Sequence, residues 1–134
     1  MNKEIEVKIK PALDAAMSML DPVGARKIYE EYDGYAASLG AAIVTSGLLP
    51  ALSFYTDVAK PDVNKNNQPL PRRYKILQAI SAVLGLGNGK TALLDHVLSL
   101  DQAEENAIKK EILSASIALK LALRSFEHIK SPQA

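Results

Sequence analysis

The fold class follows from one stretch, DQAEENAIKKEILSASIALKLALRSFEHIK (residues 101–130). Its apolar residues recur at steps of four and three, the period that places side chains on one face of an α-helix. These residues are Ile108, Ile112, Ala115, Leu119, Ala122, Phe126 and Ile129. Between Ile112 and Leu123 only Lys120 is charged, so we expect this helix, about 102–130, to be central. Asp101 followed three residues later by Glu104 is a capping-box pattern and predicts its start.

The same spacing in earlier segments predicts further helices. They are expected at about 11–20, 23–46, 48–59, 72–84 and 91–98. Residues 4–10 alternate as in a strand, but no second convincing strand is found, so we interpret them as a frayed helix start with Pro11 in the first full turn. Asp21 and Pro22 predict the start of the second helix, and Gly47 predicts a left-handed end to it.

One segment, KPDVNKNNQPLP (residues 60–71), is predicted to be a long loop because its Pro and Asn residues oppose regular structure. The sequence therefore predicts an all-α fold: a single-domain, compact helical bundle of about five to six helices over residues 1–134. A chain of 134 residues suits one domain.

The composition limits the cellular compartment and the kinds of partner that we expect for this protein. The chain has no cysteine, which fits a reducing cytoplasm, and it has no apolar run of about 20 residues that would predict a membrane span. Residues 1–20 lack a signal-peptide core, so we expect a cytoplasmic protein. With 16 basic and 15 acidic residues the net charge is +1, so nucleic-acid binding requires basic residues gathered on one face.

Residues 85–91 end in Gly89, Lys90 and Thr91, like a phosphate-binding loop. That motif has glycine five residues before its second glycine, follows a strand and precedes a helix. In this chain the position of the first glycine is occupied by Leu84, and Gly85 comes one residue too late. The segment before it has helical spacing and not the pattern of a strand. We interpret the glycines as a turn between two helices, with Thr91 capping the second. Nucleotide binding through Gly85 to Thr91 remains the least favoured alternative.

No catalytic or metal-binding pattern is evident. His96 and His128 each adjoin a carboxylate, but neighbouring helical residues point about 100° apart and do not share a metal. No His-Glu-x-x-His spacing and no Gly-x-Ser-x-Gly elbow occurs. The sequence predicts neither an enzyme nor a bound cofactor or metal.

The basic residues are the remaining candidates for a site. They form two groups, Arg72, Arg73 and Lys75 at the start of one predicted helix, and Lys120 and Arg124 four residues apart on another. They are either a solvated surface or a face that contacts RNA phosphates without reading bases.

One stretch, YAASLGAAIVTSGLLPALSFY (residues 35–55), resembles the small helical subunit of the type III-B CRISPR effector, the RNA-targeting Cmr complex. The matching residues are Tyr35, Ser38, Leu39, Ile43, Ser46, Gly47, Leu48, Ala51, Leu52 and Phe54. The resemblance spans roughly residues 8–129.

The resemblance implies a non-catalytic subunit that stacks in copies along the effector's spine in antiviral defence. The implied partners are other effector subunits, copies of itself, and guide and target RNA, with no membrane and no small-molecule substrate. A general protein-interaction bundle without a nucleic-acid role is the alternative.

Overall fold

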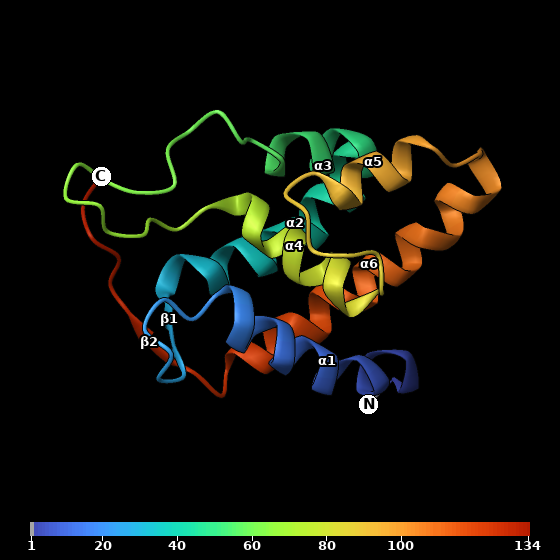
Figure 1. The fold of residues 1–134 in the computed structure, drawn as a ribbon. Helices are drawn as coiled ribbons and strands as arrows, with labels where there is room; N and C mark the ends of the chain where they lie inside the picture. Colours follow the sequence, from blue (N-terminus) through green and yellow to red (C-terminus); the bar gives the residue numbers. More distant parts are fainter. Residues whose placement is uncertain (1) are drawn as a thin grey trace.

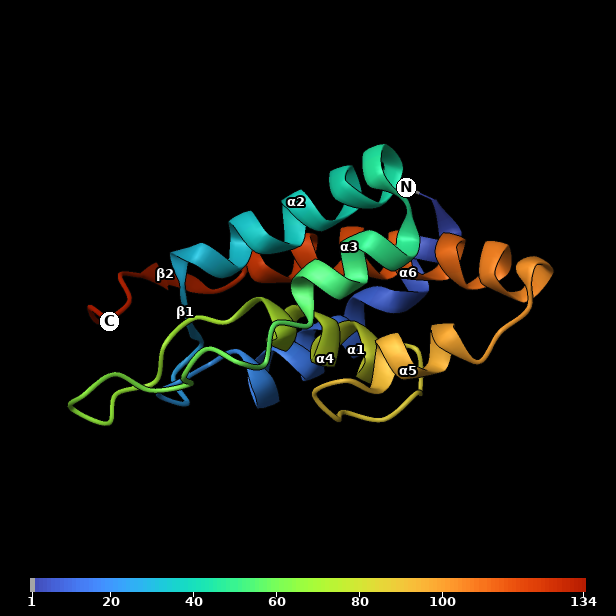
Figure 2. The same cartoon turned by 90° about the horizontal axis from the view of Figure 1, so that it is seen from above.

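The computed structural model describes residues 2–134 and is predominantly helical, which confirms the all-α prediction. Six helices are present in this range: α1 (Lys3–Met19), α2 (Glu30–Ser46), α3 (Leu48–Tyr55), α4 (Arg73–Val83), α5 (Ala92–Leu98) and α6 (Gln102–Leu123). Two three-residue strands, β1 (Lys27–Tyr29) and β2 (Glu127–Ile129), accompany them. Figures 1 and 2 show the long loop and the chain segment after β2 together at one end of the molecule. Within residues 2–134 no helix is both long enough and apolar enough to cross a membrane.

Helix α6 lies at the centre, as predicted, with α1, α2 and α4 packed around it (Figure 1). Ile112, Leu119 and Leu123 are completely buried along it. The capping box is present: the Asp101 carboxylate accepts the Glu104 N–H at 2.8 Å, and the Glu104 carboxylate accepts the Asp101 N–H at 3.1 Å. Because these bonds satisfy backbone N–H groups that an α-helix leaves unpaired, they fix where α6 begins.

Helix α1 is continuous from Lys3, so the placement of Pro11 in a first turn was wrong. The Asn2 side chain caps the helix by accepting the Glu4 N–H at 2.8 Å. Pro11 lies in the interior and cannot donate to the carbonyl of Val7. Val7 and Pro11 are both exposed, so water can bind the carbonyl that proline leaves free. The buried face of α1 is made of Ala12, Ala15 and Ala16, whose small side chains let it approach its neighbours closely.

The second helix begins at Glu30, seven residues later than the predicted Val23. The Asp21 carboxylate does cap backbone N–H groups, but those of a loop: Val23 at 3.2 Å, Gly24 at 2.9 Å and Arg26 at 2.7 Å. Gly24 and Arg26 have positive φ angles of 69° and 58°, which an α-helix cannot contain. The loop leads into β1, which was not predicted.

Strand β1 pairs in parallel with β2, placing Ile28 opposite His128. This pairing accounts for the early end of α6 at Leu123 instead of about 130. After a turn at residues 124–126 the chain becomes extended, and the Glu127 N–H donates to the Arg26 carbonyl at 3.0 Å. Phe126 lies beyond the end of the helix but is still buried. Its apolar side chain therefore reflects burial in the core and not a continuation of α6.

The shorter helices agree with the sequence more closely. Gly47 joins α2 to α3 with φ of 94° and ψ of 162°, so its φ is positive as predicted, while its ψ is not that of a left-handed helix. Pro50 lies in the first turn of α3. Thr91 precedes α5, but its hydroxyl donates to Asp95 at 2.7 Å and makes no capping bond to a backbone N–H, contrary to prediction.

Candidate nucleic-acid interface

The glycine joint connects two helices and is preceded by α4, not by a strand. Lys90, the residue that would hold phosphate in a nucleotide-binding loop, donates from Nζ to the Asp62 carboxylate at 2.9 Å. Asp62 belongs to the long loop, so this ion pair ties the loop to the joint. This geometry supports the interpretation of the joint as a turn.

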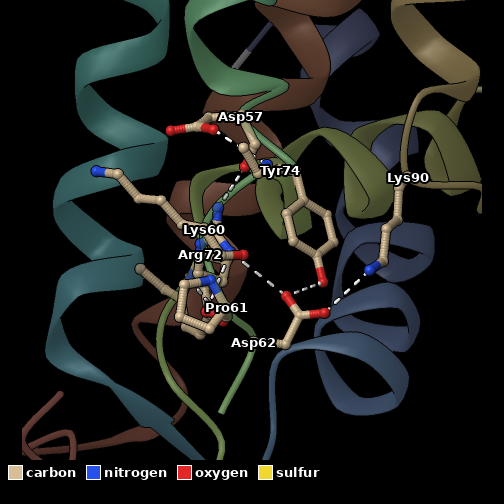
Figure 3. Close-up of polar contacts among 9 residues, drawn as sticks. Asp57, Lys60, Pro61, Asp62, Arg72, Tyr74 and Lys90 are labelled. Carbon is tan, nitrogen blue, oxygen red and sulfur yellow. Dashed lines mark hydrogen bonds and ion pairs between the residues drawn. The ribbon is translucent and has the colours of Figure 1, made fainter. Parts of the chain in front are cut away.

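Asp62 collects several donors, as Figure 3 shows. The Tyr74 hydroxyl donates to Oδ1 at 2.7 Å, and Arg72 Nη1 lies 3.5 Å from the same oxygen. The hydrogen bonds from Tyr74 and Lys90 lower the pKa of Asp62 below its usual value of 3.8 and outweigh the opposing effect of partial burial. The carboxylate is therefore held ionised as an anchor for the loop.

Arg72, one of the five predicted RNA contacts, is buried. Its guanidinium donates to the backbone carbonyls of Asp57, Lys60 and Pro61, in addition to the ion pair with Asp62 (Figure 3). A guanidinium has five N–H donors and no acceptor, so it suits a cluster of carbonyl groups. The structure thus places Arg72 inside the long loop, where it organises the backbone, and not on the surface with the other basic candidates.

The Arg73 side chain lies in a different environment from that of Arg72, against two aromatic rings. Its guanidinium carbon lies 4.7 Å from the centroid of the Tyr35 ring and 5.1 Å from that of Phe54, within the range of cation–π attraction. Its side chain lines a groove of about 460 Å³ together with Phe54, Glu31 and the long loop. Lys75 is partly exposed two residues further along α4 and lines a separate cavity of about 220 Å³ beside Tyr29 and Tyr32.

Lys120 and Arg124 lie at the end of α6, where Lys120 is partly exposed and Arg124 is exposed. The start of α4 and the end of α6 both face the end of the molecule that carries β1, β2 and the long loop (Figures 1 and 2). The structure therefore brings the elements that carry the two basic groups to one end. Whether these residues contact RNA remains a prediction.

The histidines do not form part of a cluster. The His128 ring Nε2 lies 3.0 Å from the Leu123 carbonyl, where it satisfies the last turn of α6. Over residues 2–134, no three His, Asp or Glu side chains converge in a way that would hold a metal ion.

Sequence reasoning missed the contact of Arg73 with Tyr35 and Phe54. The signal lay in an Arg and two aromatic residues on three predicted helices, but only the fold shows that these helices meet. Helices α2 and α3 are also linked by the Tyr55 hydroxyl, which donates to the Tyr35 carbonyl at 2.7 Å.

The fold and these contacts define a small, predominantly helical protein whose long loop is held by a buried arginine. The chain belongs to the CRISPR-associated Cmr5 family: the family model described as CRISPR-associated protein (Cas_Cmr5) matches residues 7–125. Cmr5 is a subunit of the type III-B Cmr complex, which confirms the family resemblance noted in the sequence.

A solved structure has the same fold. It is the X-ray crystal structure of a CRISPR-associated Cmr5 family protein from Thermus thermophilus, with 17% sequence identity and a TM-score of 0.66. The match covers 94% of this chain and 98% of that one. A comparison with curated proteins gave no match.

Proposed function

We propose that this chain is a non-catalytic subunit that stacks with copies of itself in the spine of the cytoplasmic Cmr effector. There it contacts the backbone of guide and target RNA in antiviral defence. The observation that carries the proposal is the family match over residues 7–125. The Cmr complex targets RNA, so its subunits assemble around a polyanion, and a small subunit with a net charge of only +1 must direct its basic residues to one side.

The side chains that suit phosphate contact are Arg73, Lys75, Lys120 and Arg124, since each is at least partly exposed. Arg72 acts indirectly, by holding the loop that precedes Arg73. Contacts of this kind fix position on the strand and carry no base information. One domain offers few such contacts, so the isolated chain binds weakly and stacked copies bind more tightly as a multivalent site.

The experiment is a filter-binding series on the reconstituted complex at several salt concentrations. The variants are Arg73→Ala/Lys75→Ala and Lys120→Ala/Arg124→Ala. Each removed contact lowers the slope of log affinity against log salt by about 0.7–0.9. In Lys120→Ala/Arg124→Ala, affinity falls about equally for all RNA sequences, because backbone contacts do not distinguish bases.

Lys3→Ala/Lys110→Ala is the matched control, since it removes two exposed lysines from α1 and the first half of α6. It is expected to leave the slope unchanged. Wild-type affinity and slope in both test variants would place the RNA face elsewhere and leave the chain as a spacer between other subunits. Native mass spectrometry tests stacking separately, since one copy per complex would contradict it.

A further inference from the structure

The groove beside Arg73 has the dimensions of a ligand site. Its volume is about 460 Å³, within the range of about 300–1,000 Å³ typical of small-molecule and cofactor pockets. The walls come from the start of α2, the end of α3, the long loop, the start of α4 and the segment after β2. That last segment is tied down by Asn64, whose side chain donates to the Gln133 carbonyl at 2.9 Å.

One wall of the groove is an aromatic platform. The Phe54 residue is 63% exposed, although it lies on α3 among buried neighbours. The Arg73 guanidinium packs against this ring and against Tyr35, so the ring is held in place and not free to collapse. An exposed, positioned aromatic ring beside a cation is the arrangement on which unpaired nucleic-acid bases stack.

Another wall of the groove carries the Glu31 carboxylate, one oxygen of which has no hydrogen-bond donor in the described part of the chain. Glu31 Oε2 accepts a hydrogen bond from the Ser131 hydroxyl at 2.6 Å. Glu31 Oε1 is buried and has no hydrogen-bond partner among residues 2–134. Leaving a buried acceptor unpaired is unfavourable. Because the terminal torsion of glutamate is broad, the carboxylate can turn this oxygen toward the groove, where hydrogen bonds from a ligand would replace the one from Ser131.

The groove carries charges of both signs. Lys60 and Arg73 supply positive groups, Glu31 and Asp57 supply negative ones, and the Arg72 charge is compensated by Asp62. A basic peptide would satisfy Glu31 but would be repelled by Lys60 and Arg73. A nucleotide suits Glu31, Lys60 and Arg73 together, because its base carries N–H donors and its phosphate is anionic.

We propose that this groove binds one unstacked guanine nucleotide of a single-stranded RNA. The base stacks on Phe54, its N1–H and N2–H groups donate to the Glu31 carboxylate, and its phosphate lies near Arg73 and Lys60. Guanine is selected because it alone among the RNA bases has two adjacent donors on its Watson–Crick edge, and a carboxylate only accepts. This inference rests on the proposed function and adds base recognition to it.

The test measures binding of the full chain to five-nucleotide RNAs by NMR titration. The probes are UUGUU, UUAUU, the same strand with inosine at the centre, and one with an abasic centre. UUGUU is expected to bind at least about fivefold more tightly than UUAUU, the discrimination of a good bidentate pair. Inosine lacks the N2 amino group and falls between them, and the abasic strand binds most weakly.

Two variants separate stacking from base recognition. Phe54→Leu is expected to lower the affinity for UUGUU about 5- to 150-fold without changing the salt slope, since stacking releases no counterions. Phe54→Tyr restores the affinity because it keeps the ring. Glu31→Gln is expected to bring the ratio of UUGUU to UUAUU affinity to about one. Leu98→Ala, which removes an exposed apolar side chain on α5, is the matched control.

The outcomes distinguish this proposal from the one on which it rests. Equal binding of all four strands, or no binding at millimolar concentrations, overturns the guanine site even if the assembled complex binds RNA in a salt-dependent manner. The same holds if Phe54→Leu leaves RNA affinity intact but lowers incorporation into the complex, because the groove then contacts a protein. Absence of salt-dependent RNA binding by the complex overturns the proposed function itself.

Discussion

Replacing Arg72 tests whether a buried cation holds the long loop together. In Arg72→Ala the carbonyls of Asp57, Lys60 and Pro61 lose their donor, and Asp62 loses one of its positive partners. Hydrogen bonds to a charged group contribute about 1.5–3 kcal/mol each. Adding this value for every bond overestimates the loss of stability, because Lys60 and Pro61 are exposed and water can hydrogen-bond to their carbonyls in the variant. Removing one partner of a buried ion pair typically costs about 3–5 kcal/mol, which sets the upper bound.

We therefore expect Arg72→Ala to lower the free energy of unfolding by about 2–4 kcal/mol. In urea, with a slope of about 1–3 kcal/mol/M for small proteins, a loss of about 3 kcal/mol lowers the midpoint by about 1–3 M. Circular dichroism during urea titration measures this shift. Limited proteolysis measures the local effect, with new cleavage expected between residues 56 and 72.

Arg72→Lys is the informative companion, because it keeps the charge but loses the planar fork that reaches several carbonyls. It is expected to recover only a minor part of the stability. Arg124→Ala, at an exposed position, serves as the control and is expected to change stability by less than about 0.5 kcal/mol. An Arg72→Ala variant as stable and as protease-resistant as Arg124→Ala would refute the structural role assigned to this residue.

Three further predictions concern stability. The hydrogen bonds from Tyr74 and Lys90 lower the folded-state pKa of Asp62 below 3.8, so its stabilising contribution is present above pH 3.8 and is lost as pH falls through the folded-state pKa. Asp62→Asn should flatten this acid dependence of the free energy of unfolding in urea titrations. An unchanged dependence would contradict the role of Asp62 as an anchor of the loop. Leu119→Ala, at a completely buried position of α6, should cost about 2–5 kcal/mol, whereas a loss below about 1 kcal/mol would remove Leu119 from the core. Lys90→Ala should leave the helical circular dichroism spectrum intact and increase proteolysis of the long loop, and resistance equal to wild type would show that the Lys90–Asp62 pair does not hold it.

Local signals in the sequence predicted those parts of the fold that local interactions determine. The helical period and the capping box of residues 101–104 both act within one helix, so α6 was placed at the centre and its start was correct. The period failed at its other end, where Phe126 and Ile129 continue the spacing but lie in the turn after the helix and in strand β2. What ends the helix is pairing with Lys27–Tyr29, about a hundred residues away in the sequence, and no local pattern reports such a partner.

The candidate site shows the same division. Clustering of Arg72, Arg73 and Lys75 is visible in the sequence, but adjacent residues of the same type have opposite environments here. Arg72 precedes α4 and turns into the loop, whereas Arg73 packs against rings from α2 and α3. Burial of an arginine by backbone carbonyls leaves no mark in composition, because every residue carries a carbonyl group.

The packing of α1 has a consequence for how the protein is made. The alanine face of α1 lies mainly against α6, which is synthesised last among the helices. A nascent chain on the ribosome therefore cannot bury this face until residues of α6 have emerged, and a lone helix of this length is only marginally stable in water. Assembly of the core must wait until α6 has been synthesised, and the early helices then acquire their stability in a single cooperative step. Destabilising α6 should accordingly unfold α1 as well, instead of leaving a stable N-terminal fragment.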